Sequence, residues 1–373
     1  MARNYEDVRR DLYEMFGEDF EELESGSSDS ESVSTTVSDR STVSFSNLSP
    51  DEEWNEETAI ENNFPFTGTP EINISEASTK GPIQYFKAVF QDSFMTSLAD
   101  MTNMHAQILM SRPLKPNSRI TKWKATNILE LWTFLGILFY IGTARLSRIA
   151  DYWKKSYLVK FNINNYMSRD RFLLLLRCLF FNTTYETRIK YSKIDYLLNY
   201  FNDMMKQLVY PERELSIDES MVGFRGRVVF RQYIKNKRHK YGIKLYVLAD
   251  PKGLVHRIHM YKGSQDIEVG GNGHVDKVVM TLLKDYLNSG HSIYMDNFYN
   301  SVHLAEKLLL KETYCTGTLA VKRKNNPKTV VMKKLLKGEN IFRYNRNGVC
   351  VCKWKDKRDV LTISTEHSPN MMP

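Results

Sequence analysis

The spacing of the apolar residues changes near residue 214, and this change most restricts the folds that the chain can adopt. From about residue 82 to residue 210, apolar residues recur every three or four positions, which is typical of helices that bury one face. From residue 214 onward, short alternating runs are separated by turn residues, which is typical of strands. We therefore predict an α+β or α/β chain, with a helical domain over residues 81–210 and a mixed sheet with covering helices over residues 211–373.

The helical region contains several segments with clear signals. The residues that form one apolar stripe at helical spacing are Tyr85, Phe86, Val89, Phe90, Phe94, Leu98 and Met101. The run from Ile128 to Ala144 is apolar, but Glu130 leaves too short a clean stretch for a membrane span, so we predict a buried core helix. Ser168 is a suitable N-cap for the buried helix RDRFLLLLRCLFF, and a further helix is expected from Asp195 to Leu208.

The second region is predicted to contain short strands interrupted by two helices. The strands are expected at residues 215–222, 242–249, 255–261, 291–295, 315–321, 340–344, 349–355 and 359–364, and the helices at residues 275–287 and 301–311. Three strands that can pair as a meander, followed by alternating helices and strands, give a mixed sheet. This order is compatible with a ribonuclease-H-like core.

The first 80 residues differ in composition from the rest of the chain. They contain 20 acidic and 5 basic side chains, whereas the remaining residues carry a net charge of +23. The segment from Glu24 to Pro50 is dense in serine and acidic residues and cannot bury a core, so we predict that residues 1–80 are a disordered acidic tail. The tail is either a solubilising segment or a phosphoacceptor region whose added charge would compete with DNA for the basic remainder.

Several classes of protein are disfavoured by the cysteines and by the amino terminus. The four cysteines are unevenly spaced, which argues for a reducing compartment and against a disulfide framework. Cys350 and Cys352 form a Cys-x-Cys pair without a second ligand pair, which argues against a zinc site. The amino terminus lacks the apolar segment of a signal peptide, and we expect no membrane partner.

Cations and aromatic rings alternate in the stretch that runs from Glu214 to Lys244. This mixture suits a polyanion whose bases can stack, although a solvated basic face is the alternative interpretation. The residues predicted to bind DNA are Arg225, Arg227, Arg231, Lys235, Lys237, Arg238, Lys240 and Lys244, together with Lys322 and Arg323 of a later basic segment. A DNA partner implies the nucleus, and the basic clusters at residues 235–240 and 322–328 support it weakly.

Two aspartates are candidates for metal chemistry on phosphate. Asp218 lies in the middle of a predicted strand, and Glu219 must point to the opposite face because side chains alternate. Asp296 follows the end of another strand, where open sheets present ligands and catalytic groups. Two carboxylates brought together there would repel unless a cation lay between them, and oxygen ligands suit Mg²⁺ or Mn²⁺, which promote phosphodiester transfer. The alternative is that both aspartates are caps or turn formers.

Several long strings in the sequence resemble the piggyBac transposase family. They are SIDESMVGFRGRVVFRQYIKNKRHKYGIKLYVLAD, YMDNFYNSVHLAEKLL, TGTLAVKRKNNP and WKDKRDVLTISTEH, with FKAVFQDSF, MTNMHA and RLSRIADYW upstream. The similarity covers about residues 82–373. It implies a DDE-type transposase, in which a helical dimerisation and DNA-binding domain precedes a ribonuclease-H-like core that cuts and joins double-stranded DNA with Mg²⁺, at transposon ends and TTAA targets.

In this resemblance, Asp218 and Asp296 match the first two catalytic, metal-binding carboxylates of the family. The third acid of the family lies on a segment resembling GGVDxxDQ, downstream of the WKDKRDV string, and this sequence does not include it. The resemblance therefore implies an incomplete core that binds Mg²⁺ or Mn²⁺ weakly and does not complete transposition alone.

Three interpretations of the whole chain stay open at this point. The first is a truncated transposase, inactive as it stands. The second is a non-catalytic DNA-binding or regulatory protein, acting as a homodimer or as a dimer with a full-length relative. The third is a decaying coding sequence without a folded product, which the intact motifs disfavour.

Overall fold

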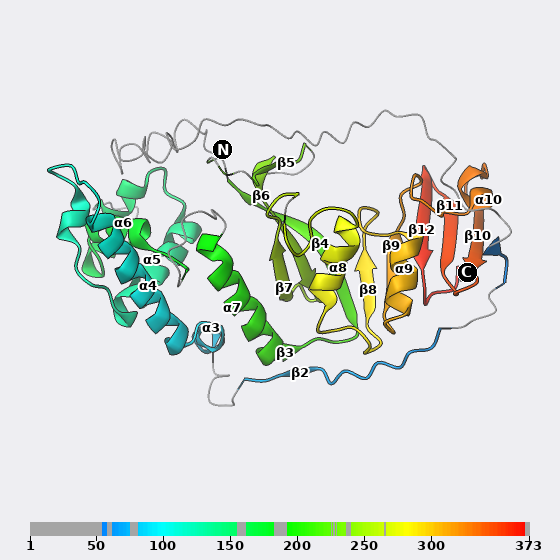
Figure 1. The fold of residues 1–373 in the computed structure, drawn as a ribbon, viewed down its shortest axis with the longest axis horizontal. Coiled ribbons are helices and arrows are strands. Elements are labelled where there is room, and N and C mark those ends of the chain that lie inside the picture. The colour runs from blue at the N-terminus through cyan, green and yellow to red at the C-terminus, as the bar shows by residue number, and fades with distance from the viewer. Residues whose placement is uncertain are drawn as a thin grey trace. The chain divides into compact units, whose positions relative to one another are not determined.

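The structure is a computed structural model that describes residues 54–57, 62–74, 81–154, 162–182, 192–224, 226, 228, 230–235, 240–264 and 266–369. The described chain divides into two compact units (Figure 1). Among the described residues, those from 74 to 200 belong to the first unit, and those from 54 to 73 and after 200 belong to the second.

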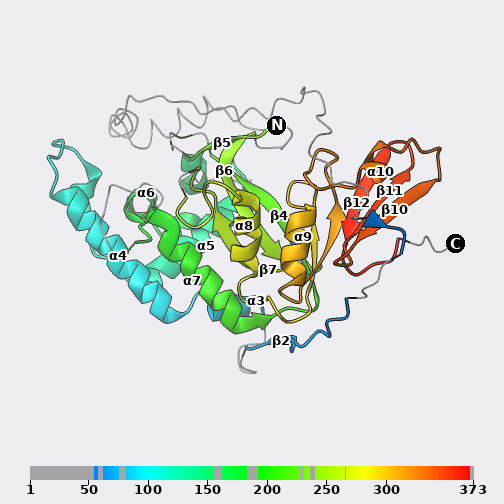
Figure 2. The ribbon, with the colours of Figure 1, turned by 45° about the vertical axis from the view of Figure 1, so that its right-hand side comes forward.

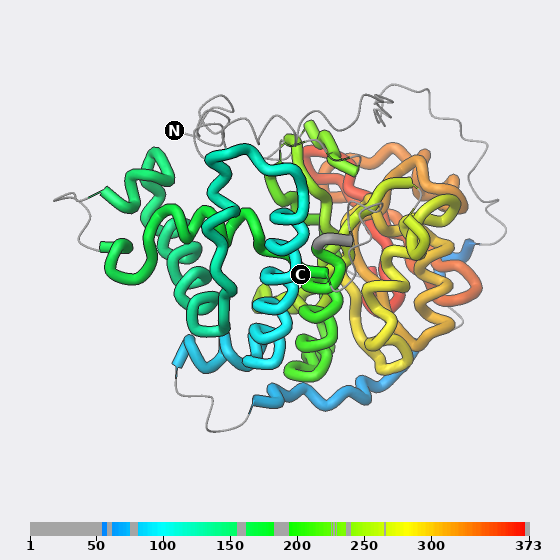
Figure 3. The backbone as a smooth tube through the Cα atoms, turned by 60° about the vertical axis from the view of Figure 1, so that its left-hand side comes forward, coloured from blue at the N-terminus to red at the C-terminus, as the bar shows by residue number. Residues whose placement is uncertain are grey.

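Helices and short 3₁₀ turns build the first unit (Figure 3). Its helices are α3 (Pro82–Val89), α4 (Asp92–Met110), α5 (Ile128–Ala144), α6 (Arg169–Cys178) and the start of α7 (Ser192–Leu208). The bounds of α5 are those predicted, because the Asn127 side chain accepts a hydrogen bond from the Glu130 N–H and so begins the helix. Ser168 caps α6 in the same way by accepting from the Arg171 N–H, as predicted.

Two predictions for this unit need correction. The apolar stripe over residues 85–101 lies on two helices, because Phe90 and Gln91 leave the helical conformation between α3 and α4. Aromatic packing nevertheless continues across the break, since the ring centroid of Phe90 lies 4.7 Å from that of Phe86 and 5.7 Å from that of Phe94. Secondly, α5 buries only one face, and Phe139 on its other side is 62% exposed.

Among the helices in the described ranges, none combines the length and the apolar composition that a membrane span requires.

A mixed sheet forms the centre of the second unit. Its middle strands are β4 (Glu214–Gly223), β6 (Tyr241–Ala249), β7 (Val255–Met260), β8 (Ser292–Met295) and β9 (Tyr314–Thr318), in the spatial order β7-β6-β4-β8-β9. The pairs β7·β6 and β6·β4 are antiparallel, whereas β8 lies parallel to both β4 and β9. Helix α8 (His274–Leu283) connects β7 to β8, and helix α9 (Val302–Leu309) connects β8 to β9.

Three antiparallel strands extend this sheet beyond β9 (Figure 2). They are β12 (Asp359–Ser364), β11 (Cys350–Lys355) and β10 (Asn340–Asn345), and the short helix α10 (Lys328–Met332) precedes them. On the other side, β5 (Gln232–Tyr233) pairs with β6. The sequence predicts all of these strands except β5, and it does not predict α10.

The core of the second unit explains why apolar and polar residues alternate along the strands. Leu215 and Ile217 of β4 are buried, whereas Asp218 is exposed. The buried side chains pack with Val279 and Leu282 of α8 and with Leu304 of α9 in one apolar cluster. A strand with one buried face therefore fixes which side chains reach the opposite face of the sheet.

The prediction of a disordered tail up to residue 80 is wrong for residues 54–57 and 62–74. The strand β1 (Trp54–Asn55) pairs with β10, and Trp54, only 6% exposed, belongs to the main core. The strand β2 (Glu71–Ile72) pairs with β3 (Val209–Tyr210). These two-residue strands have no periodicity of their own and are held by distant partners, so composition could not reveal them. The serine-rich segment over residues 24–50 lies outside the described residues.

Candidate active site

The strand register brings Asp218 and Asp296 to neighbouring positions near the carboxyl end of β8. Ile217 of β4 pairs with Met295 of β8, and the two aspartates are the next residues along these parallel strands. Neighbouring strands lie about 4.8 Å apart, so Asp296, just after the end of β8, lies beside Asp218, although β4 itself continues to Gly223. Both residues are exposed, whereas Ile217 and Met295 are buried.

Hydrogen bonds hold each aspartate. In the turn after β8, Asp296 Oδ1 accepts from the Phe298 N–H at 2.9 Å, and the Asp296 carbonyl accepts from the N–H groups of Tyr299 and Asn300, both at 3.2 Å. Asp218 Oδ1 accepts from the Glu219 N–H at 2.7 Å. An aspartate that stabilises its own turn is a common structural feature, and here the turn also holds Asp296 just after the carboxyl end of β8.

The neighbouring strand β9 fits closely against the base of this turn. A Cβ atom added to Gly317 would lie 1.8 Å from the Met295 carbonyl oxygen, so only glycine fits there. Asn300 Nδ2 donates to the carbonyls of Met295 at 2.9 Å and of Thr318 at 3.0 Å, which ties β8 to β9. The position of Asp296 is therefore fixed by two strands and not by the turn alone.

A group of tyrosines lies beneath the aspartates on the face that the helices cover. Glu219 pairs in register with the buried Tyr246, which places Glu219 on the face opposite to Asp218, as predicted. Burial raises the pKa of the Tyr299 phenol, and the carboxylates of Glu219, Asp218 and Asp296 raise it further. Three acidic side chains from two strands thus act on one buried hydroxyl.

Further contacts connect this group to the covering loops. Tyr246 Oη lies 2.7 Å from His274 Nε2, and His274 Nδ1 lies 2.7 Å from the Val269 carbonyl. Because a carbonyl only accepts, Nδ1 carries the proton and Tyr246 donates to Nε2. The ammonium of Lys244 lies 4.4 Å from the ring centroid of Phe298, beside the Asp296 turn.

The chemistry of the aspartate pair fits a divalent cation. Carboxylate oxygens are the ligands that Mg²⁺ and Mn²⁺ prefer. Within the described ranges, however, no group of three or more His, Cys, Asp or Glu side chains is arranged so that it could hold a metal ion. Asp218 and Asp296 are therefore two suitable ligands without a third protein ligand beside them in that part of the chain. Elsewhere, burial raises the pKa of the Cys350 thiol to about 12 and so disfavours the thiolate that zinc requires.

The structure distributes the predicted DNA-binding residues over three places. Arg225, Arg227, Lys237 and Arg238 lie outside the described residues. Arg231, Lys235 and Lys240 are exposed around β5 and the start of β6, where the rings of Tyr233 and Tyr241 lie 4.8 Å apart. Lys244 is half-buried within β6, and Lys322 and Arg323 follow β9.

Arg323 has a role that the sequence did not indicate. Its Nη2 donates to the carbonyls of Asn297, at 3.2 Å, and Phe298, which belong to the Asp296 turn. No local pattern in the sequence signals such a contact, because it joins residues about 25 positions apart.

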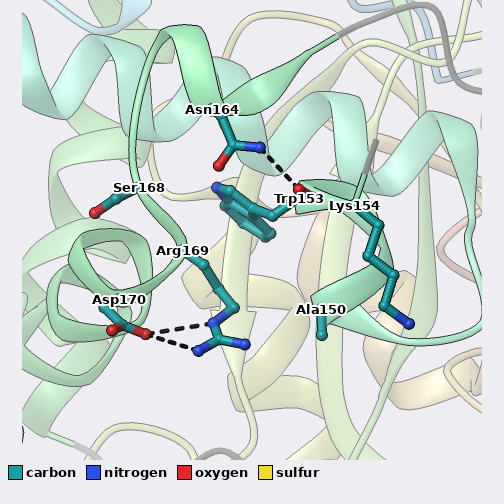
Figure 4. Close-up of a pocket in the computed structure, with 7 residues that line it drawn as sticks. All are labelled: Ala150, Trp153, Lys154, Asn164, Ser168, Arg169 and Asp170. Carbon is teal, nitrogen blue, oxygen red and sulfur yellow. Dashed lines mark hydrogen bonds and ion pairs between the residues drawn. The ribbon is translucent and has the colours of Figure 1, made fainter. Parts of the chain in front are cut away.

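A pocket of about 340 Å³ in the helical unit does not resemble a catalytic site (Figure 4). Its charged side chains pair with close neighbours, Arg169 with Asp170 at 3.2 Å and Lys154 with Asp151 at 2.7 Å. The Trp153 indole N–H donates to the Met167 carbonyl at 2.8 Å. Local pairing accounts for these groups.

Comparison with known proteins gives consistent matches. The family model described as Transposase IS4 matches residues 81–373. The human piggyBac transposable element-derived protein 3 is 26% identical over 246 residues, which are 63% of this chain and 41% of that protein. The human chimeric ERCC6-PGBD3 protein is also 26% identical over 246 residues, which are 63% of this chain and 23% of that protein. The chain thus spans less than half of either relative.

The fold also has a match among solved structures. A chain in the cryo-EM structure of a piggyBac transposase synaptic complex with hairpin DNA superposes with a TM-score of 0.68. The match is 24% identical and covers 82% of this chain and 65% of that chain. The likeness concerns the arrangement of the mixed sheet and its helices.

Proposed function

Because this chain belongs to the piggyBac transposase family, we propose that it is a transposase-derived DNA-binding protein whose sheet carries part of a Mg²⁺-dependent strand-cleaving site. The observation that carries the proposal is the strand register that sets Asp218 of β4 beside Asp296 at the carboxyl end of β8. The partner would be double-stranded DNA, at transposon ends and TTAA-like targets, and the location the nucleus.

The strand order supports a ribonuclease-H-like core of the DDE type. Such a core has a three-stranded antiparallel meander followed by two parallel strands, and this is the order of β7, β6, β4, β8 and β9. The helices α8 and α9 are the crossover connections that parallel strands need. The described helices α3 to α7 are the candidates for the dimerisation and DNA-binding domain, in a homodimer or with a full-length relative.

Asp218 and Asp296 would hold the cation, Mg²⁺ or Mn²⁺. When bound, the cation would activate the attacking oxygen of a phosphodiester transfer and stabilise the leaving one. The chain itself supplies the carboxylates, fixed by the Asp296 turn and by the close fit of Gly317 against Met295. With only two protein ligands among the described residues, the cation would be held weakly there.

DNA contact is proposed for the exposed cations around β5 and β6. Lys235 and Lys240 lie near the paired rings of Tyr233 and Tyr241, and the Arg231 guanidinium lies 5.5 Å from the Tyr241 ring centroid. Cations would neutralise phosphates, and the exposed rings would stack on unpaired bases.

The catalytic part is tested by nicking of supercoiled plasmid DNA with Mg²⁺ or Mn²⁺. We expect Asp218→Asn and Asp296→Asn each to abolish any metal-dependent nicking and to reduce Mn²⁺ binding, whereas Asp356→Asn, an exposed control outside the pair, changes neither. Nicking that survives both substitutions would disprove the assignment. Mn²⁺ binding without nicking by the unaltered chain would support the non-catalytic DNA-binding alternative.

The DNA-binding part is tested by the dependence of affinity on salt. Lys235→Ala and Lys240→Ala are each expected to lower the slope of log affinity against log salt by about 0.9 if each cation neutralises one phosphate. Lys311→Ala serves as the control, because Lys311 is an exposed cation between α9 and β9, and β8 and β4 separate β9 from β6 in the sheet. Equal slopes for all three variants would mean that this surface is only a solvated basic face.

A further inference from the structure

The side chain of Arg323 reaches from the segment after β9 to the turn after β8. Its Nη2 donates hydrogen bonds to the carbonyl oxygens of Asn297 and Phe298. These two residues directly follow Asp296. The contact therefore connects the loop that carries one candidate metal ligand to a neighbouring strand.

The segment that carries Arg323 is itself well anchored. The Arg323 N–H donates to the Ala320 carbonyl at 3.0 Å. The fully buried Asn326 donates through Nδ2 to the carbonyls of Ala320 at 3.0 Å and Val321 at 3.3 Å. Because the turn is fixed at both of its ends, the guanidinium is presented from a rigid base and not from a mobile loop.

The electrostatic surroundings of Arg323 also point to this loop. Burial lowers the pKa of the half-buried guanidinium, and the carboxylates of Asp276 and Asp296 oppose this effect. Arginine keeps its charge under these conditions. The positive charge of Arg323 therefore lies within electrostatic reach of the Asp296 carboxylate.

The planar guanidinium of Arg323 is suited to holding the turn after Asp296. One Nη nitrogen carries two N–H groups in a fixed plane, and here they serve two successive carbonyls. An ammonium is a flexible point charge and fixes the direction of its hydrogen bonds less well. Holding both carbonyls restricts rotation of the peptide groups Asn297–Phe298 and Phe298–Tyr299. The N–H of the first of these groups, that of Phe298, donates to the Asp296 carboxylate.

We propose that Arg323 is a positioning residue that fixes the Asp296 turn so that the carboxylates of Asp218 and Asp296 can share one divalent cation. The inference rests on the proposed function, since it presupposes that the aspartate pair binds the cation. It assigns to Arg323 a role within the protein in place of the DNA contact predicted from the sequence.

The test is Mn²⁺ affinity of the full chain without DNA, measured by electron paramagnetic resonance of the free ion. Loss of a residue that orients a metal ligand typically weakens metal binding about 10- to 100-fold, and we expect that range for Arg323→Met. Arg323→Lys is expected to recover part of the loss. Lys324→Met, a change at an exposed neighbouring cation, should leave the affinity within about twofold of the parent, well below that range.

The outcomes separate the inference from the proposed function. If the parent chain binds Mn²⁺ and both Arg323 variants bind it equally well, the positioning role is wrong. A lower salt slope of DNA binding in Arg323→Met, with unchanged Mn²⁺ affinity, would also overturn it and would restore the DNA contact. If the parent chain binds no Mn²⁺ that Asp218→Asn removes, the proposed metal site itself fails. Should Arg323→Met not fold, as judged by circular dichroism, Arg323→Lys decides alone.

Discussion

The two ends of the parallel strands β4, β8 and β9 are built in opposite ways. At the amino ends, residues 62–68 lie across the sheet, and His291 and Tyr314 beneath them are 0% and 3% exposed (Figure 2). Beyond the carboxyl end of β8, Asp296 is open to water, as is Asp218 beside it in β4, and Phe298 is 37% exposed. One end of the same three strands is closed by the chain itself, and the other is left accessible.

Aromatic packing and hydrogen bonds close the amino ends. The ring of Phe64 lies 5.3 Å from that of Tyr314, and the ring of Phe66 lies 4.9 Å from that of His291. The Tyr314 hydroxyl donates to the Asn62 carbonyl at 3.2 Å. The polar groups of Tyr314 and His291 are buried there with hydrogen-bond partners, so these contacts stabilise the fold.

The carboxyl ends keep groups that a purely structural edge would neutralise. Two carboxylates lie on adjacent strands, and in the part of the chain that the structure describes the buried Tyr299 hydroxyl has no hydrogen-bond partner. Like charges and unsatisfied buried hydroxyls both reduce stability. The comparison indicates that stability is concentrated at one end of the strands and the candidate chemistry at the other.

Truncation of an aromatic side chain should show the largest difference in stability between the two ends of the strands. Tyr314→Ala removes a buried ring that packs on Phe64 and lies 5.3 Å from the Arg213 guanidinium, so we expect a loss of about 4 kcal/mol in the free energy of unfolding. Phe298→Ala, the matched change at the carboxyl ends, should cost about 1 kcal/mol because that ring is partly exposed. Urea denaturation measures both values, and equal losses would contradict the comparison.

Substitution of one glycine at the carboxyl ends, Gly317, should reduce stability strongly, unlike other changes at that end. Gly317→Ala places a Cβ against the Met295 carbonyl, and neither backbone can retreat without separating β8 from β9. We expect a loss of about 3 kcal/mol, with weaker Mn²⁺ binding because Asp296 moves with β8. Gly338→Ala is the control with open space around its Cβ, although its positive φ adds strain of about 1 kcal/mol. A Gly317→Ala variant as stable as the parent would show that the strands are less tightly fitted.

The amino ends should also respond to mild acid. Burial lowers the pKa of His291, opposed in part by its hydrogen bond to the Arg213 carbonyl, so the folded state prefers the neutral ring. The unfolded chain takes up the proton first as the pH falls below about 6.5, and stability is lost between that pH and the lower pKa of the folded state. We expect a loss on the order of 1 kcal/mol between pH 7.5 and pH 5.

Urea midpoints at these two pH values test the assignment. His291→Gln should reduce the difference between the two midpoints. His303→Gln, a change at a largely exposed histidine, should leave that difference unchanged. Part of the difference should persist in His291→Gln, because burial also lowers the pKa of His256. A pH dependence unchanged by His291→Gln would assign the effect to other groups.

Local patterns predicted the elements on which the site depends. Alternation defined β4 and placed Asp218 and Glu219 on opposite faces, and the short apolar run before Asp296 defined β8. The helix between β7 and β8 forms a crossover connection, which makes β8 parallel to β7 and so to β4. This arrangement places Asp296, after the end of β8, beside Asp218 in β4. These features follow from periodicity and connection rules within about 80 residues.

Contacts between distant segments could not be predicted in this way. Trp54 pairs with Asn345, almost 300 positions later, and its own surroundings are acidic and polar. Arg323 looks like any cation in a basic segment until the Asp296 turn is seen against it. Both roles depend on partners that neither spacing nor composition identifies.

The smallest expected effect on stability lies at the candidate site itself. Asp218→Asn and Asp296→Asn each remove one of two neighbouring like charges in an exposed setting, so each should raise the free energy of unfolding by about 0.5 kcal/mol at low salt. The gain should shrink as salt screens the repulsion. Urea denaturation at two ionic strengths measures it, with Asp356→Asn as the control. A clear loss of stability in either variant would mean that the carboxylates hold the fold together, and the separation between a stabilising end and a functional end would then fail.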